Sequence, residues 1–374
     1  MDIARWIPNH QNFFPSILGT LGSALCKLKT SLQTERLIPQ NSTFGIEEET
    51  GFQLSVPLER LPNTFDFWEN ALTEAQSTLS LGTEYSNAAV AKLSEGNIWR
   101  RKIREVRTSV LYNKKTLNRT TQGPVINTRI LEDNTRALQR AHLVLAFLVH
   151  FYVHSMLPSE KATGVVVPKT LAVPLVAVSD ILGTAPVLTY SDTVLWNLVP
   201  RIPEQPITMD NLKAAQLFSG TDDEEQFYIT SAGVEIRGAE ILQIIESYYM
   251  LPDVQDVNAI ATIATMLTRV AGIIGEISDI IQSIRAGCDP QVFNYSIRHW
   301  FEGSDANGPT APAWVYEGAD PSRQLDLSGP SAGQSPTMHA LDLWLDIDHK
   351  LAEKRKPVPS EENRRADTGF MQRM

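Results

Sequence analysis

Apolar residues in the second half of the chain repeat mainly with the period of an α-helix. Residues 136–154 are so densely apolar that they predict a strongly hydrophobic helix. Further helices are predicted over residues 65–81, 226–249, 256–285 and 290–301. The stripe of the longest of these is expected to be core, and consists of Ile260, Ile263, Ala264, Leu267, Val270, Ile274, Ile277 and Ile281.

Three other stretches carry different signals. Residues 165–178 are β-branched and interrupted by proline, which predicts extended structure or short strands. Thr221 and Glu224 have the spacing of a capping box and predict the start of the helix that follows. Residues 328–342 begin with small side chains, including Gly329 and Gly333, and turn into a helical pattern. This last stretch is either a flexible linker or a segment whose backbone approaches a ligand closely.

Composition narrows the class of protein. The 374 residues include 43% hydrophobic and 20% charged residues, which is ordinary for a globular protein with a sizeable core. A net charge of −10 argues against nucleic acid as a partner. Cys26 and Cys288 are the only cysteines, so a reducing, cytoplasmic compartment is expected. Neither a clear signal peptide nor a run of membrane-spanning length is expected, so no membrane partner is predicted.

Few groups in the sequence look catalytic by themselves. No catalytic triad, phosphate loop or dinucleotide fingerprint occurs. His150 and His154 lie four apart on a predicted helix, but with no third ligand they are interpreted as ordinary helix histidines. Sites built from Phe, Tyr, Ser and Arg have little acid or base power, which favours a protein whose reactive centre is a bound cofactor.

Seven segments, in order, resemble the indoleamine 2,3-dioxygenase family. They are residues 45–52 (GIEEETGF), 171–174 (LAVP), 186–192 (PVLTYSD), 227–235 (FYITSAGVE), 293–298 (FNYSIR), 315–318 (VYEG) and 331–335 (SAGQS). The resemblance implies a mainly α fold with an N-terminal extension at 1–43, a small mixed α/β domain at 44–220 and a larger helical haem domain at 221–374. It also implies a monomer with haem b, whose iron supports cleavage of the indole C2–C3 bond of L-tryptophan by O₂ to N-formylkynurenine, a step of tryptophan catabolism by the kynurenine pathway.

The resemblance also assigns site residues. Ser231 and Arg298 take the catalytic positions, and Arg298 is suited to gripping a substrate carboxylate. The substrate-binding positions fall on Tyr190, Thr193, Val194, Phe227, Phe293 and Arg298, and the haem-contacting positions on Ser331, Ala332, Gly333 and Asp342.

Three departures from the family pattern affect the expected activity. Pro330 follows Gly329 where two glycines are usual, and Asn294 replaces a second aromatic, which makes the predicted pocket more polar. The family's iron-binding histidine lies in a Met-Pro-x-x-His-Arg motif that this sequence does not contain, and the chain is expected to stop before it. The metal ligand is therefore unassigned, with only His339 and His349 as weak substitutes.

Three hypotheses stay open. The chain is a dioxygenase of tryptophan or a related indole, a catalytically impaired binding or regulatory protein, or an oxygenase of another indole in a specialised-metabolite pathway. Residues 1–374 alone are predicted to bind haem poorly and to turn over little.

Overall fold

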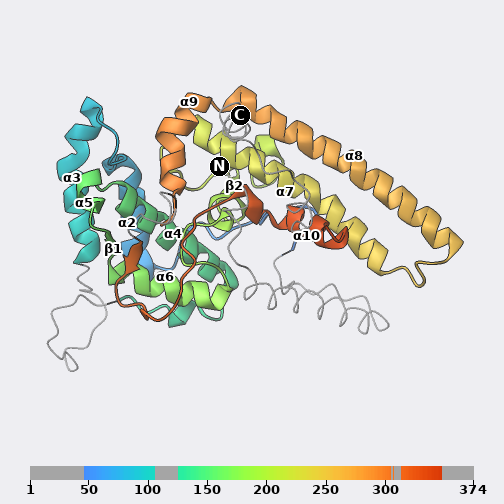
Figure 1. Cartoon of the computed structure of the whole chain (residues 1–374), viewed down its shortest axis with the longest axis horizontal. Coiled ribbons are helices and arrows are strands. Elements are labelled where there is room, and N and C mark those ends of the chain that lie inside the picture. The colour runs from blue at the N-terminus through green and yellow to red at the C-terminus, as the bar shows by residue number, and fades with distance from the viewer. Residues whose placement is uncertain (1–45, 106–124, 305, 307–312, 348–374) are drawn as a thin grey trace, which may run out of the picture. The chain divides into compact units, whose positions relative to one another are not determined.

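The computed structural model describes residues 46–105, 125–304, 306 and 313–347 (Figure 1). They form two compact units that interleave along the sequence. Among the described residues, unit 1 comprises 46–55, 230–283 and 333–347, and unit 2 comprises 56–105, 125–229, 284–304, 306 and 313–332. The fold is mainly α, as predicted. The division into domains at residues 44–220 and 221–374 stays a prediction, and the extension at 1–43 lies outside the described residues.

Unit 2 is built around helix α4 (Thr135–His154), in which 17 of 20 residues are buried. Asn134 caps its first turn by accepting the N–H of Ala137. Helices α2 (Asp66–Thr78) and α6 (Lys169–Leu182) pack against it, and α3 (Asn87–Arg104) lies against α2 and α6. The predicted apolar helix over 136–154 is thus confirmed as the centre of a core.

Two short sheets and several single turns complete unit 2. Strand β1 (Val165–Val167) pairs in parallel with β4 (Trp314–Tyr316), and β2 (Leu198–Pro200) pairs antiparallel with β3 (Leu212–Ala214). The remaining elements are α5 (Pro158–Lys161), α9 (Pro290–Val292), η2 (Asn63–Phe65), η3 (Arg129–Leu131), η4 (Ser191–Leu195), η5 (Met209–Asn211), η6 (Phe293–Ile297), η7 (Arg298–Phe301) and, at the boundary of the two units, η8 (Ala332–Gln334).

Unit 1 takes most of two long helices, α7 (Asp222–Tyr249) and α8 (Val257–Gly287), together with α10 (Pro336–Trp344). Figure 1 shows α7 and α8 running side by side as a hairpin. Their contact is a small apolar core that α10 joins through one buried leucine; it comprises Val234, Ile241, Val270, Ile273, Ile277 and Leu341.

Three sequence predictions were wrong in part. Only residues 165–167 of the predicted extended segment form a strand, and helix α6 follows because Pro168 stands at its N-cap, where the missing N–H is not needed. The predicted helix over 290–301 is broken into α9 and the turns η6 and η7. The apolar stripe of α8 is only partly core, because Ile260, Leu267, Ile274 and Ile281 are 38–53% exposed.

The predicted capping box at the start of α7 is half formed. Thr221 Oγ1 accepts the N–H of Glu224 at 3.3 Å, as expected. The Glu224 carboxylate instead accepts the backbone N–H groups of Phe218 and Ser219, the Ser219 hydroxyl and the Tyr228 hydroxyl, at 2.6–2.8 Å. Burial raises the pKa of this carboxyl group, against the lowering effect of the four hydrogen bonds.

Among the described residues, α8 is long and apolar enough to cross a membrane by length and composition. The expectation that no run reaches that length was therefore wrong for residues 257–287. Length and composition alone are weak grounds for a membrane span.

Candidate functional site

The first segment of the predicted site in unit 2 is a π-helical turn. In η4 the N–H of Trp196 donates to the carbonyl of Ser191, a bond between residues five apart. Tyr190 precedes this turn, and Thr193 and Val194 lie within it; all three are buried. The Thr193 hydroxyl donates to the carbonyls of Thr189 and Tyr190. Turns of this kind occur frequently at functional sites, since the extra residue displaces side chains from their regular helical positions.

A second π-helical turn holds Phe293 and Arg298. In η6 the N–H of Arg298 donates to the carbonyl of Phe293. A regular α-helix rotates by about 100° per residue, so residues five apart point to different sides. The wider π turn brings them nearer to one side. Phe293 and Arg298 are both half-buried, whereas Asn294 is exposed.

Aromatic side chains connect α7 to this second turn within unit 2. The rings of Phe227 and Phe293 lie 4.8 Å apart, and Phe227 also stacks on Phe301 at 6.1 Å. Phe218 stacks on Trp300 at 5.5 Å and contacts Phe301 at 6.1 Å. The structure thus brings two predicted substrate residues, Phe227 and Phe293, into direct contact at one end of an aromatic cluster.

The loop that follows is fixed at its start. Gly329 has a φ of +89°, and a Cβ atom at this position would lie 2.7 Å from the carbonyl oxygen of Phe301. Only glycine fits this conformation and this spacing, so the backbone at Gly329 is held against the segment that carries the aromatic cluster. Ser331 is half-buried and Ala332 is exposed.

The end of the same loop is anchored within unit 1. Glu235 of α7, which is fully buried, accepts the hydroxyl of Ser335 and the N–H of Thr337, which is 3.3 Å away. Ser335 in turn caps α10 by accepting the N–H of Met338. Gly238 leaves room for Thr337, whose Cγ2 would lie 2.2 Å from a Cβ atom there. Of the predicted residues in unit 1, Ser231 and Asp342 are half-buried and Gly333 is exposed.

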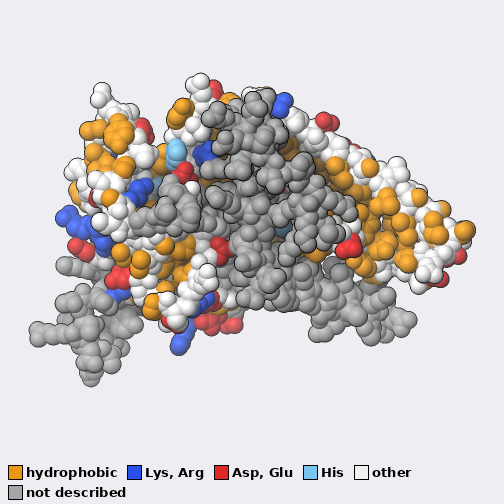
Figure 2. All heavy atoms as spheres, viewed as in Figure 1, with side chains coloured by type: hydrophobic (Ala, Val, Ile, Leu, Met, Phe, Trp, Pro, Cys, Tyr) orange, Lys and Arg blue, Asp and Glu red, His pale blue; other side chains and the backbone are white. Residues whose placement is uncertain are grey.

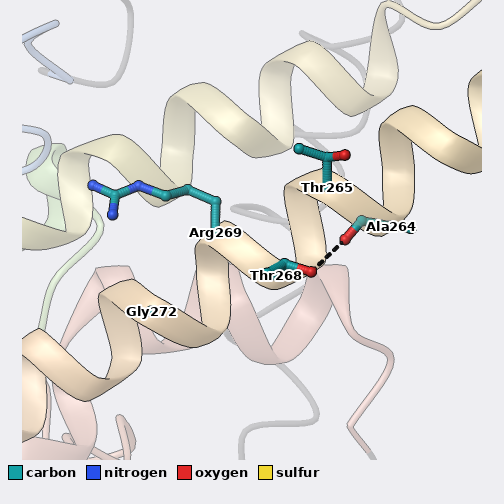
Figure 3. A pocket seen from close by; sticks show the side chains of 5 residues that line it. All are labelled: Ala264, Thr265, Thr268, Arg269 and Gly272. Carbon is teal, nitrogen blue, oxygen red and sulfur yellow. Dashed lines mark hydrogen bonds between the residues drawn. The ribbon is translucent and has the colours of Figure 1, made fainter.

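A shallow groove of about 470 Å³ runs along α8, and none of the predicted site residues lines it. Figure 3 shows Ala264, Thr265, Thr268, Arg269 and Gly272 lining it. The Thr265 and Thr268 hydroxyls donate back to carbonyls of their own helix, and Arg269 pairs with Glu240 and Glu276. Because these polar groups are engaged within the protein, the groove offers little to recognise a ligand, and the turns η4 and η6 are the stronger candidate.

Two of the side chains considered as metal ligands have other partners. His150 and His154 each bond to a backbone carbonyl, as expected for ordinary helix histidines. Among the described residues no three His, Cys, Asp or Glu side chains are grouped to hold a metal ion. His339, a weak substitute ligand, is half-buried on α10, and His349 lies outside the described residues.

The residue types of the predicted site are chemically suited to a haem group. Phenylalanine rings, small loop side chains and an arginine suit a flat apolar macrocycle and an anionic substrate. An axial iron ligand is not assigned among the described residues.

Some contributors to the site were missed from the sequence. Phe301 and Phe218 extend the aromatic contact of Phe227, and Asp192 with His142 supports the turn η4. Phe301 stood at the end of a predicted helix, and that position gave no signal of its contact with α7. Such contacts join residues that are far apart in the chain.

The comparisons with known proteins agree on one family. The family model described as indoleamine 2,3-dioxygenase matches residues 40–374. Indoleamine 2,3-dioxygenase 1 of Rattus norvegicus is 28% identical over 311 residues, which cover 83% of this chain and 67% of the rat protein. Indoleamine 2,3-dioxygenase of Saccharomyces cerevisiae is 30% identical, covering 58% and 48% of the two chains. A protein of Fusarium equiseti named 6-hydroxytryptophan 2,3-dioxygenase is 25% identical, covering 59% and 54%. The chain belongs to the indoleamine 2,3-dioxygenase family.

Proposed function

We propose that the chain is a haem-dependent dioxygenase that opens the indole ring of L-tryptophan or a related indole. The reaction breaks the C2–C3 bond of the indole and places one atom of O₂ on each carbon, giving N-formylkynurenine from tryptophan. The observation that carries the proposal is the contact of Phe293 with Phe227, together with the π-helical turn η6, in which the N–H of Arg298 donates to the carbonyl of Phe293. Two aromatic rings, one of them on the same turn as an arginine, suit an indole that bears a carboxylate.

Each predicted residue has a role that its chemistry supports. Arg298 pairs with the substrate carboxylate, and Phe227 and Phe293 pack against the indole ring. Tyr190, Thr193 and Val194 supply the buried wall carried by η4. Ser231 follows Phe227 by four residues on α7, about one helical turn, and its hydroxyl takes the catalytic position that the family resemblance assigns to it.

Haem would contact the small residues Ser331, Ala332 and Gly333, with Asp342 as a further contact. When bound, haem supplies the activation of O₂, which the protein side chains cannot provide. The side chains of the chain itself bind and orient the indole. These assignments, a monomeric state and a cytoplasmic location stay predictions.

Related indoles are included because of one residue and one relative. Asn294 replaces the aromatic residue usual in the family, and the Fusarium equiseti relative is named for 6-hydroxytryptophan. Asn294 is exposed in the structure, so a polar effect on the pocket also stays a prediction. A binding or regulatory role without turnover is the second candidate.

The test compares two substrates that differ by one carboxylate. Full-length protein loaded with haem is assayed with tryptophan and with tryptamine, which lacks the carboxylate. The Arg298→Gln variant is expected to lose about 10- to 100-fold in kcat/KM for tryptophan, the equivalent of one charge-assisted hydrogen-bonded pair, and much less for tryptamine. Arg323→Gln is the matched control, because Arg323 forms an exposed pair with Asp180 and should change neither value.

Equal losses for both substrates would refute the role of Arg298. An absorption spectrum of the ferrous–CO complex shows independently whether haem is held. Haem binding without product from tryptophan, 6-hydroxytryptophan or tryptamine would refute the dioxygenase and favour the binding role.

A further inference from the structure

Helix α4 carries three buried histidines, and each contacts a segment next to predicted substrate residues. His142 bonds to Asp192 in η4, between Tyr190 and Thr193. His150 bonds to the carbonyl of Trp300, and His154 to that of Glu302, both just after Arg298. Helix α4 packs against η4 and η7, so the histidines sit at these two contacts.

The surroundings of His142 determine its charge. Its Nδ1 lies 2.6 Å from Asp192 Oδ1, and its Nε2 lies 3.0 Å from the carbonyl oxygen of Ala185. With Asp192 as a carboxylate both partners are acceptors, and the two bonds then form together only when both ring nitrogens carry a proton. His142 and Asp192 are fully buried, and an imidazolium facing a carboxylate leaves no net charge inside.

Asp192 also forms hydrogen bonds with the residue that leads into the turn η4. Its second oxygen accepts the N–H of Thr189 at 2.8 Å and the Thr189 hydroxyl at 2.7 Å. The carboxylate thus holds the residue before Tyr190, while the backbone of Asp192 itself lies within the π-helical turn. The carbonyl of Ala185, bound to His142, belongs to the same approach to the turn.

His150 and His154 act differently, as neutral rings. Nδ1 of His150 donates to Trp300 O at 2.7 Å, and its Nε2 faces the N–H of Leu188 at 3.4 Å, so one nitrogen is a donor and the other an acceptor. Nε2 of His154 donates to Glu302 O at 2.8 Å. Burial lowers the pKa of His150 to about 4 and that of His154 well below its usual value.

We propose that these three histidines are positioning residues, with His142 as an imidazolium that fixes the π-helical turn η4 through Asp192. A π-helical turn is less favourable than a regular helix and persists where its surroundings hold it. Without the pair, Tyr190, Thr193 and Val194 can shift toward regular helical positions. The effect on substrate rests on the proposed function, whereas the charge state of His142 and the protection of the turn do not.

The competing explanation is that the pair only satisfies buried polar groups, as such pairs commonly do. The Arg140–Glu69 pair separates the two explanations. It is also buried and lies two residues away on α4, with Arg140 NH2 and Glu69 Oε2 2.7 Å apart, but its partner lies on α2. If both pairs are merely structural, mutating either one should have similar effects on η4. If the His142–Asp192 pair positions the turn, only its mutation should increase hydrogen exchange at η4.

The first experiment requires no activity. Histidine ring nitrogens of the ¹⁵N-labelled full-length protein are observed by NMR at pH 7, with His142→Gln assigning the His142 signals. Both nitrogens of His142 are expected to be protonated, and a signal from one unprotonated nitrogen would overturn the proposal. Hydrogen exchange at the Trp196 amide, measured relative to Leu145, is expected to rise about tenfold in His142→Gln and to stay unchanged in the control Arg140→Lys. Equal ratios in the two variants would also overturn it.

The second experiment measures steady-state kinetics with tryptophan. His142→Gln is expected to raise KM about tenfold, because small displacements of binding residues have large effects, while Arg140→Lys leaves KM near the wild-type value. A KM that His142→Gln changes no more than Arg140→Lys would refute the positioning role. If the wild-type protein turns over no indole, the proposed function fails, and the NMR and exchange results still decide the present proposal.

Discussion

Helices α4 and α8 are both long and apolar, yet the protein surrounds them in opposite ways. In α4, 17 of 20 residues are buried. In α8, only Ala259, Val270, Ile273 and Ile277 are buried among 31 residues. Figure 2 shows the consequence as orange side chains gathered over the exposed face of α8. The same kind of apolar pattern therefore serves as the centre of one core and as one wall of another.

The polar side chains of the two helices also differ in their partners and in their exposure to solvent. Along α4, buried histidines and Arg140 each have a dedicated partner on a neighbouring segment. Along α8, Arg269 joins Glu240, Glu276 and Arg237 in an exposed network of ion pairs that links α8 to α7. Polar groups in α4 must be satisfied inside the protein, whereas those of α8 can rely on water. The comparison predicts distinct responses to mutation, pH and salt.

The largest expected difference comes from shortening one leucine in each helix. Leu145→Ala in α4, where the side chain is fully buried, is expected to lower the unfolding free energy by about 2–5 kcal/mol. Leu267→Ala in α8, where the side chain is 43% exposed, is expected to change it by about 0.5 kcal/mol or less. Hydrogen exchange of the amides of each helix measures both effects locally. A loss of more than about 2 kcal/mol at Leu267 would mean that its face is covered in solution.

The α8 stripe shows how far hydrophobic spacing can be trusted. Residues 256–285 were correctly predicted as a helix, because the period of 3.6 is a property of the segment itself. Which part of a wide stripe meets the core depends on the neighbouring helix, and here α7 covers Val270 and Ile277 but leaves Ile260, Leu267 and Ile274 exposed. The local sequence carries no information about that choice.

The candidate site was predictable to a similar extent. The motif at 227–235 and the motif at 293–298 identified Phe227 and Phe293 separately, and the structure shows that the two rings touch. The π-helical turns were not predicted, because an extra residue in a turn leaves no regular change in the pattern. Asp192 was quoted in a motif, but its pairing with His142 joins residues 50 positions apart and follows only from the packing of α4.

The second prediction concerns pH, which should act first on α4. The pKa of His150 is lowered to about 4 from 6.5 because burial disfavours the charged ring. The folded state therefore binds this proton less readily than the unfolded state, so stability is fully present above pH 6.5 and is lost as the pH falls toward 4. The loss from His150 alone is expected to be about 3 kcal/mol.

Exchange of α4 amides between pH 7 and 4, corrected for intrinsic rates, measures this loss. His150→Gln should flatten the pH dependence, since glutamine does not titrate. The corresponding control is His299→Gln, because His299 is partly exposed and pairs with Glu302 near the surface. If the stability of α4 depended on pH as steeply in His150→Gln as in the wild type, the loss could not be attributed to His150.

The smallest effect is expected in the ion-pair network of α8, and in a lower pH range. Hydrogen bonds from Arg269 and Arg237 lower the pKa of Glu240 to about 2 from 4.5. The contribution of the ionised Glu240 to the free energy of unfolding is therefore present above pH 4.5 and is lost as the pH falls through 2. Because about a third of the Glu240 side chain is exposed, solvent screening limits the cost of Glu240→Gln to about 1 kcal/mol at pH 7.

Raising the salt concentration to about 1 M should remove most of the stability difference between wild type and Glu240→Gln, measured by hydrogen exchange at α8 amides. The cost of Leu145→Ala at α4 amides should not be reduced. If salt left the Glu240→Gln difference intact, the network would have to be shielded from solvent, and the contrast between a buried α4 and an open α8 would no longer hold.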